Sequence, residues 1–332
     1  MGVIVDTRVG EGRCAMAEMP GPSVQARALA LFMSSTIRPI ADRVRLQGLY
    51  LRVIRESFDA LGFMPLPRGT KVRPVSEPHG YGDVRGAWIC AREADETAGA
   101  ILYLHGGGFV FGSIRTHKHL AAALSASSGL PVLLLEYRRP PEHLFPAAAD
   151  DAVAGYHWLL DQGFPASKIV VAGDSAGGHL TVGLLADLTR LRLPMPGAAV
   201  LFSPFLDLHC TQLDDRDAAR RDPFIPPARA REAAVVYAGP TDLADPRLTV
   251  LKGSKRRWPP MLIQVGDTEC LLGDSERLAT AMRMAGAHCE LQVWPGQVHV
   301  FPAFYPIIPD GRLAIRYAGD FLRETLAESL AA

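Results

Sequence analysis

The chain has 332 residues, and its 35 Lys and Arg are balanced by 35 Asp and Glu, so the formal charge is zero when His is neutral. This balance provides no long-range attraction for phosphate backbones or anionic lipids, which argues against nucleic-acid binding as the main function. With 48% hydrophobic and 21% charged residues, the composition is that of an ordinary globular protein with a large core.

Apolar residues recur every three or four positions over residues 24–38 and 44–61, which predicts two amphipathic helices. Pro39 is expected to end the first of them. We interpret residues 1–62 as the N-terminal helical part of a cap. A stretch rich in Pro, Gly and charge, at 65–83, is expected to act as a connector.

From residue 63 onwards, short apolar runs alternate with helical patterns. Strands are expected at 84–91, 99–104, 131–136, 168–172, 197–202 and 261–265, with a last strand beginning at His288. Helices are expected at 117–127, 147–162, 177–192, 275–285 and 313–330. This alternation predicts an α/β domain over residues 63–332, with a mostly parallel central sheet and helices on both faces.

Residues 204–258 interrupt the alternation with charges, prolines and little apolar regularity. In an open α/β sheet, ligands bind beyond the carboxyl ends of the strands, where long insertions can cover them. We therefore interpret this segment as a cap insertion. The alternative is that this segment is a long solvent-exposed loop without a functional role.

The five cysteines are scattered and include no CxxC pair: Cys14, Cys90, Cys210, Cys270 and Cys289. This pattern predicts neither a disulfide framework nor a metal cluster, and it favours a reducing, cytoplasmic location. Asp6 and Arg8 interrupt the short apolar run at the start of the chain, so no signal peptide is expected. No segment reaches the roughly 18 apolar residues of a membrane span.

A G-x-S-x-G motif centred on Ser175 lies between the strand at 168–172 and the helix at 177–192. Its glycines permit a sharp turn that exposes the serine hydroxyl in a strained conformation. The positive end of the following helix favours the negative charge that develops in acyl transfer. This context predicts a nucleophile, although the motif also arises by chance and a serine before a helix is usually an N-cap.

A His-Gly-Gly-Gly sequence at 105–108 follows the strand at 99–104. Consecutive glycines expose backbone N–H groups and permit close approach, so Gly107 and Gly108 are candidate oxyanion donors together with Ala176. We expect His105 to brace this loop. The alternative is a flexible turn, which explains the glycines but not their place at the carboxyl end of a strand.

The general base is expected to be a histidine that lies beyond the last strands along the chain. His299 follows a turn and can project from a loop, whereas His288 begins a strand. The acid is expected on the loop after the strand at 261–265, where Asp267, Glu269 and Asp274 compete. Spacing alone does not choose among them.

Together these residues resemble the hormone-sensitive-lipase-like α/β-hydrolases, the bacterial family IV esterases. The motifs that carry the resemblance are His-Gly-Gly-Gly at 105–108, Tyr-Arg at 137–138, Pro-Glu-His at 141–143, Phe-Pro-Ala-Ala at 145–148, Gly-Asp-Ser-Ala-Gly-Gly at 173–178 and the segment ending at His299. They run from about residue 85 to 305. The resemblance implies an α/β-hydrolase fold with a helical cap.

The resemblance also implies a role for each site residue. Ser175 would be the nucleophile, His299 the base, and Gly107, Gly108 and Ala176 the oxyanion donors. Many family members carry Asp-Pro-Leu at the acid, and ungapped alignment back from the histidine places Glu269-Cys270-Leu271 there. We therefore favour Glu269 as the acid, with Asp267 in reserve, and expect Asp274 to support the following helix as an N-cap or as a charge.

The function implied is hydrolysis of short- to medium-chain acyl esters through an acyl-enzyme, without a metal or an organic cofactor. Aromatic residues that could line an acyl pocket, or equally belong to the core, are Phe109, Phe111, Phe205 and Phe224. The partner expected is a small-molecule ester. An exposed edge strand or the closing helix could also support a homodimer.

Two other functions stay open at this point. The same machinery cleaves amides, as in amidases and N-acetyl deacetylases of small metabolites, and the sequence does not separate these from esterases. The plant gibberellin receptors, which resemble this family, bind a ligand on a hydrolase scaffold but have lost the catalytic histidine. Because His299 is present, we favour an enzyme. Its kcat/KM should fall on the acid side near an unperturbed histidine pKa of ~6.5.

Overall fold

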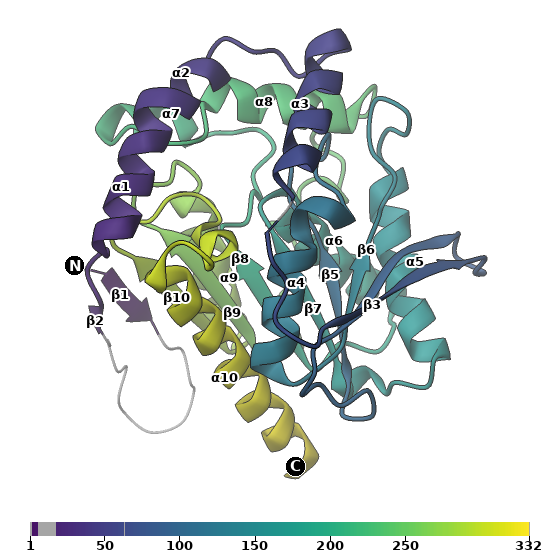
Figure 1. Cartoon of the computed structure of the whole chain (residues 1–332). Helices are drawn as coiled ribbons and strands as arrows, with labels where there is room; N and C mark the ends of the chain where they lie inside the picture. The colour runs from purple at the N-terminus through teal and green to yellow at the C-terminus, as the bar shows by residue number, and fades with distance from the viewer. Residues whose placement is uncertain (1, 6–17, 63, 332) are drawn as a thin grey trace.

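The computed structural model describes residues 2–5, 18–62 and 64–331 (Figure 1). Within these residues, ten strands form one sheet: β1 (Gly2–Val5), β2 (Glu18–Met19), β3 (Lys71–Glu77), β4 (Val84–Cys90), β5 (Ala100–Leu104), β6 (Val132–Leu135), β7 (Ile169–Asp174), β8 (Ala198–Phe202), β9 (Met261–Gly266) and β10 (Cys289–Trp294). Their spatial order is β2-β1-β10-β9-β8-β7-β5-β6-β4-β3. In this spatial order, the strands β10, β9, β8, β7, β5 and β6 each pair in parallel with the next. The predicted mostly parallel sheet is therefore confirmed.

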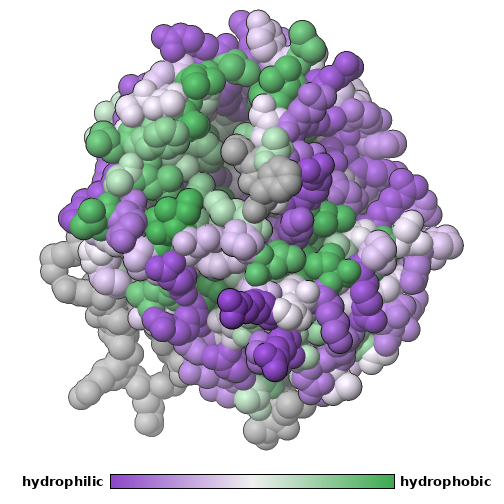
Figure 2. Space-filling model, in the orientation of Figure 1, coloured by the Kyte–Doolittle hydropathy of each residue, from purple (hydrophilic) through white to green (hydrophobic). Residues whose placement is uncertain are grey.

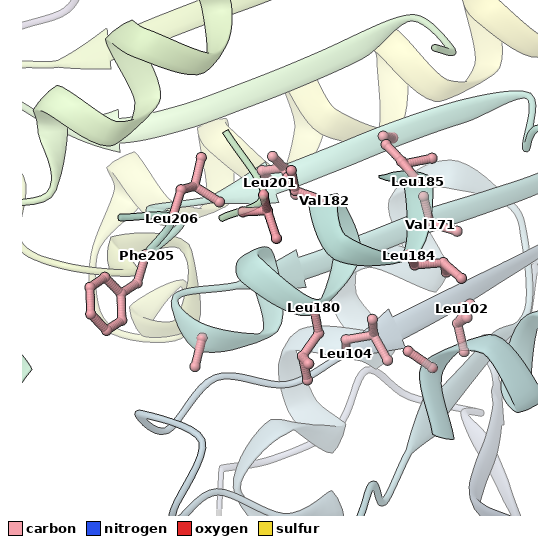
Figure 3. Packing of buried hydrophobic residues seen from close by; sticks show 14 of the residues in the cluster. Leu102, Leu104, Val171, Leu180, Val182, Leu184, Leu185, Leu201, Phe205 and Leu206 are labelled. Carbon is pink, nitrogen blue, oxygen red and sulfur yellow. The ribbon is translucent and has the colours of Figure 1, made fainter. Parts of the chain in front are cut away.

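Helices cover both faces of the sheet, as predicted. One face carries α4 (Ile114–Ser128) and α10 (Pro309–Ala331), and the other carries α5 (Ala147–Asp161), α6 (Ala176–Leu191) and α9 (Leu272–Met284). Figure 3 shows apolar side chains of α6 packed against apolar side chains of β5, β7 and β8. The helix contributes Leu180, Val182, Leu184 and Leu185, and the strands contribute Leu102, Leu104, Val171 and Leu201. Because these strands are buried along their whole length, their carboxyl ends form a rigid edge for the residues that follow them.

Pro39 does not end the first N-terminal helix, in contrast to the prediction. The chain runs from α1 (Val24–Phe32) through a π-helical turn, η1 (Met33–Ile37), into α2 (Arg38–Ala41). Pro39 lies in the first turn of α2, a position at which a proline is tolerated. The second predicted helix is α3 (Gly48–Leu61), which begins later than residue 44.

The stretch at 65–83 contains the strand β3 and is not only a connector, which corrects the sequence-based expectation. β3 pairs antiparallel with β4 from Lys71 opposite Cys90 to Glu77 opposite Val84. Val75 is its one buried residue, so the segment lacks the apolar alternation by which strands are recognised. Its place at the edge of the sheet also accommodates a proline.

Residues 204–258 contain two helices, α7 (Leu213–Ala219) and α8 (Pro227–Ala238), despite their weak apolar pattern. The buried face of α8 consists largely of alanines, which give little hydrophobic contrast along the sequence. Figure 1 shows these helices gathered with α1, α2 and α3 above the carboxyl ends of the central strands. In Figure 2 the same face is hollowed between α1 and α3, and apolar side chains gather on the side of the hollow toward α1.

Four cysteines of the described part of the chain are buried and form no disulfide: Cys90, Cys210, Cys270 and Cys289. Cys14 lies outside the described residues. Among the described helices, none is both long enough and apolar enough to cross a membrane.

Candidate active site

Ser175 lies at the corner between β7 and α6, with φ 51° and ψ −119°. A non-glycine residue in this region of backbone space is strained, and such strain persists only where the surroundings enforce it. A Cβ on Gly177 would overlap the carbonyl oxygen of Leu104 at the end of β5, and one on Gly173 would overlap the carbonyl of Gly177. The glycines therefore allow the helix to start against the strand ends.

The backbone of Ser175 is held by the neighbouring strand. Its N–H donates to the carbonyl of Phe202 at 3.0 Å, and its own carbonyl accepts from the N–H of Phe205 at 3.0 Å. Ser175 occupies the N-cap position of α6, but its side chain makes no capping hydrogen bond. The hydroxyl is therefore not used as a cap, the alternative that the sequence left open.

The imidazole of His299 contacts the carboxylate of Glu269. Nδ1 of His299 lies 2.7 Å from Oε2 of Glu269, and the two residues are 4% and 2% exposed. With a carboxylate as its partner, Nδ1 carries the proton, so Nε2 is left as the acceptor of the neutral ring. A buried carboxylate bound to histidine orients the ring and stabilises its protonated form.

The other oxygen of Glu269 is also hydrogen-bonded. Oε1 accepts from the backbone N–H of Gly266 at 2.6 Å and from the hydroxyl of Ser203 at 2.7 Å. The hydroxyl oxygen of Ser203 in turn accepts from the N–H of Val300, next to the histidine, at 3.0 Å. Since Ser203 directly follows Phe202, whose carbonyl holds Ser175, this serine joins the three segments of the site.

Sequence reasoning missed Ser203, although a signal existed. The signal is its place directly after the strand expected at 197–202, which lies beside the strand that leads to Ser175, whereas its φ of 48° is visible only in the structure.

The competing carboxylates are bound elsewhere. Asp267 Oδ1 accepts from the N–H of Gly296 at 2.6 Å, and Oδ2 pairs with Arg220 at 2.8 Å. Asp274 lies in the first turn of α9 and Leu271 is the N-cap, so the expected N-cap is wrong, whereas the expected charge at the start of the helix is confirmed. The carboxylate of Asp274 instead accepts from the amides of residues 206 and 207 and thereby anchors the start of the insertion.

The pKa of His299 reflects two opposing effects. Burial of the ring lowers it, but the charge and hydrogen bond of Glu269, together with the charges of Asp222 and Asp174, outweigh burial. The pKa of His299 is therefore raised above the ordinary 6.5. The unperturbed value used in the sequence-based expectation does not apply.

The glycine loop lies beside the corner that carries Ser175. Asp174, the residue before the serine, accepts from the N–H of Gly106 at 3.0 Å and from the hydroxyl of Tyr103 at 2.8 Å. Within the described residues, the N–H groups of Gly107 and Gly108 donate to no protein acceptor. Both have positive φ, 117° and 56°. Asp174, which sequence reasoning passed over within its motif, thus fixes the loop next to the serine.

His105 packs inside this loop. Its ring stacks on Tyr137 with centroids 4.3 Å apart, and Nδ1–H donates to the carbonyl of Gly106 at 2.8 Å. Burial holds the pKa of His105 well below its ordinary value, so the ring stays neutral. These contacts agree with the expected bracing of the loop.

Two of the aromatic residues expected at an acyl pocket belong to the core. Phe109 is completely buried and stacks on Tyr237 with centroids 3.9 Å apart, and Phe205 is 3% exposed in the same cluster. Phe111 is half-buried against Phe58, and the half-buried ring of Phe224 lies 6.2 Å from the ring of His299. The described residues contain no group of three His, Cys, Asp or Glu side chains that could hold a metal ion.

Comparison with known proteins places this geometry in a family. A family model described as the alpha/beta hydrolase fold matches residues 101–303. An acetyl-hydrolase of Streptomyces hygroscopicus is 39% identical over 272 residues, which cover 82% of this chain and 88% of that protein.

Two solved structures are similar over nearly the whole chain. An esterase from the bacterial hormone-sensitive lipase family is 33% identical with a TM-score of 0.82, covering 92% of this chain and 100% of that one. The structure of EstE5, soaked with p-nitrophenyl butyrate, is 34% identical with a TM-score of 0.82, covering 92% and 99%. The chain therefore belongs to the α/β-hydrolase family, in its hormone-sensitive-lipase-like branch.

Proposed function

We propose that this protein is a serine carboxylesterase in which Ser175 is the nucleophile, His299 the general base and Glu269 the acid. The observation that carries the proposal is the buried 2.7 Å contact between Glu269 and His299, joined through Ser203 to the strained corner at Ser175. The relatives named as an acetyl-hydrolase and as esterases support ester hydrolysis as the activity.

In the first half-reaction, Nε2 of His299 takes the proton of the Ser175 hydroxyl as the oxygen attacks the ester carbonyl carbon. The tetrahedral intermediate then collapses, and the imidazolium gives its proton to the departing alkoxide. Glu269 remains ionised and stabilises the imidazolium throughout. Water, activated by the same histidine, attacks the acyl-enzyme, and release of the acid regenerates the serine.

The oxyanion receives hydrogen bonds from the backbone N–H groups of Gly107, Gly108 and Ala176. Donors held in advance at a site where charge develops lower the barrier because no reorganisation is needed during the reaction. Support comes from the unused amides of the two glycines and from the clamp of Asp174 on Gly106. Ala176 begins α6, so its N–H lies at the positive end of the helix.

Residues 1–62 and 204–258 together form a cap over the catalytic domain of residues 63–332. Support comes from the gathering of α1, α2, α3, α7 and α8 over the strand ends in Figure 1. Under such a cap the substrate is a small ester with a short to medium acyl chain, and the half-buried Phe111 and Phe224 border the acyl group. A cytoplasmic location and a homodimer remain predictions from the sequence.

The proposal is tested by replacing Ser175 with Ala and measuring hydrolysis of p-nitrophenyl butyrate. Loss of a triad nucleophile should lower kcat by about 10⁴-fold or more, because only binding and the oxyanion donors remain. The variant Ser57→Ala, at an exposed serine of α3, is the control and should keep full activity. Retention of most activity in Ser175→Ala would show that the assignment is wrong.

A further inference from the structure

The buried guanidinium of Arg38, in α2, joins the N-terminal helices to α7 and to the loop that follows it. Nη1 and Nη2 donate to the two carboxylate oxygens of Asp217 at 3.0 and 2.8 Å. Nη1 also donates to the carbonyls of Asp222 and Ile225 at 2.6 and 3.1 Å, and Nε donates to Asp42 at 3.1 Å. A planar guanidinium with acceptors on all sides holds the loop in one conformation, since any displacement leaves a buried donor unpaired.

Asp222 extends this connection to the loop that carries Glu269. Its side chain is fully buried, and Oδ1 accepts from the backbone N–H groups of Phe224 and Ile225 at 2.7 and 2.9 Å. Oδ2 accepts from the backbone N–H of Cys270 at 2.9 Å. Because Cys270 directly follows Glu269, the carboxylate of Asp222 holds the chain beside the acid.

We propose that Asp222, held in place by Arg38, is a positioning residue for the pair of Glu269 and His299. This inference rests on the proposed function. Asp222 does not contact the reacting atoms and acts through the backbone of Cys270. The N-terminal helices then have a second role, because through Arg38 they help to hold the acid against the histidine as well as covering the strand ends.

The charge of Asp222 adds an effect that can be measured separately from stability. Burial lowers the pKa of His299, whereas the carboxylates of Glu269, Asp222 and Asp174 raise it. Loss of the negative charge of Asp222 therefore lowers the pKa of His299. The neutral, active imidazole then persists to lower pH, and the acid limb of kcat/KM moves in the same direction.

The test measures kcat and KM for p-nitrophenyl butyrate as a function of pH, together with thermal unfolding, on full-length variants. In Asp222→Asn, an amide N–H₂ replaces one acceptor among three backbone donors, so the acid loop shifts. We expect kcat to fall by about 10- to 100-fold, with a smaller change in KM and an acid limb at lower pH. Asp217 is partly exposed. We expect Asp217→Asn to shift kcat and the acid limb in the same direction as Asp222→Asn does, but by a smaller amount.

Arg221→Gln is the matched control. Arg221 precedes Asp222 in the same loop, but its side chain is 60% exposed and pairs with Asp42 at 2.9 Å, away from the acid loop. We expect this variant to keep the kcat and the acid limb of the wild type.

The outcomes separate this inference from the proposed function. If Ser175→Ala is inactive while folded Asp222→Asn and Asp217→Asn keep the kcat and the acid limb of the wild type, Asp222 has no positioning role and the proposed function stands. A lower unfolding temperature alone, with unchanged kcat and acid limb, has the same meaning. If Asp222→Asn does not fold, Asp217→Asn decides by the same criteria. Activity in Ser175→Ala would instead overturn the proposed function.

Discussion

His299 is buried, and yet in the proposed mechanism it must gain a positive charge. Burial alone would keep the ring neutral and make it a weak base, whereas the ionised Glu269 stabilises the imidazolium. The raised pKa shows which effect prevails. At the scale of the residue, the site therefore combines a ring shielded from water with a partner that compensates for the shielding.

This balance predicts the pH dependence of the reaction. We expect kcat/KM for p-nitrophenyl butyrate to decline as the pH falls through the pKa of His299, because only the neutral ring can act as base. Since that pKa is raised, the midpoint of the acid limb should lie above ~6.5. A profile that stays flat between about pH 5 and pH 8 would be incompatible with the role of His299.

The two carboxylates that the sequence did not separate by spacing can be separated by substitution. Glu269→Gln should lower kcat by up to about 10⁴-fold, because an amide that donates to Nδ1 favours the wrong tautomer of the imidazole. Asp267→Asn should change kcat by less than about tenfold, since Asp267 makes an ion pair with Arg220 that is partly exposed. Equal losses in the two variants, measured under identical conditions, would count against Glu269 as the acid.

At the scale of the element, the corner between β7 and α6 depends on close backbone contact. Helix α6 can begin beside the ends of β5 and β8 only because small residues precede and follow Ser175. The same helix contains Gly183, where an added Cβ would meet only Val250 Cγ1 at an ordinary 3.5 Å. Gly177 and Gly183 of this helix therefore differ, because close packing requires a glycine at the first position and not at the second.

Thermal unfolding of two alanine variants tests this difference. Gly177→Ala should be destabilising and inactive, because its Cβ overlaps the carbonyl of Leu104 and must displace the strand end or the helix. Gly183→Ala should stabilise the protein by roughly 0.5–1 kcal/mol, because alanine is favoured over glycine inside a helix. If both variants unfold at the temperature of the wild type, the steric account of the corner is wrong.

Regular elements of the sheet could be predicted from sequence because their apolar runs are continuous and buried on both faces. The edge strand β3 could not be predicted, since it buries only one side chain. Helix α8 was not predicted, because its alanines differ little in hydrophobicity from their polar neighbours. The continuation of the first helix past Pro39 depends on a π-helical turn, η1, which the local sequence does not indicate. In each case contacts distant in sequence outweigh the local pattern.

Those candidate site residues could be predicted from the sequence that belong to a motif within one short segment. Ser175, the glycine loop and His299 could be proposed from the sequence because turns and glycines mark them. Ser203 and Asp222 were not, because their importance comes from hydrogen bonds to segments far away in the sequence. The sequence left open whether Phe109 lines a pocket or belongs to the core, because its stacking on Tyr237 arises only in the folded chain.

At the scale of the whole molecule, the parallel sheet brings together segments that lie far apart along the chain. The glycine loop follows β5, Ser175 follows β7, Ser203 follows β8, and Glu269 follows β9. Because all these strands run in the same direction, their following residues meet at one edge. The helices gathered over that edge in Figure 1 form the proposed cap.

The proposed cap predicts a limit on the acyl chain. Comparing kcat/KM across p-nitrophenyl esters from acetyl to dodecanoyl should give a maximum at a short or medium chain, because the space beneath the helices must hold the acyl group beside the core. Enlarging that space with Phe224→Ala, at the ring bordering His299, should move the maximum to longer chains. A maximum at twelve carbons in the wild type would contradict the prediction.

The convergence of three segments on one carbonyl carbon is tested most directly by the crystal structure of the protein reacted with a phosphonate ester. The account predicts phosphorus bonded to the oxygen of Ser175, a phosphonyl oxygen facing the amides of Gly107, Gly108 and Ala176, and His299 between the serine and Glu269. A phosphonyl group on another residue, or an imidazole of His299 turned away from the modified serine, would contradict it.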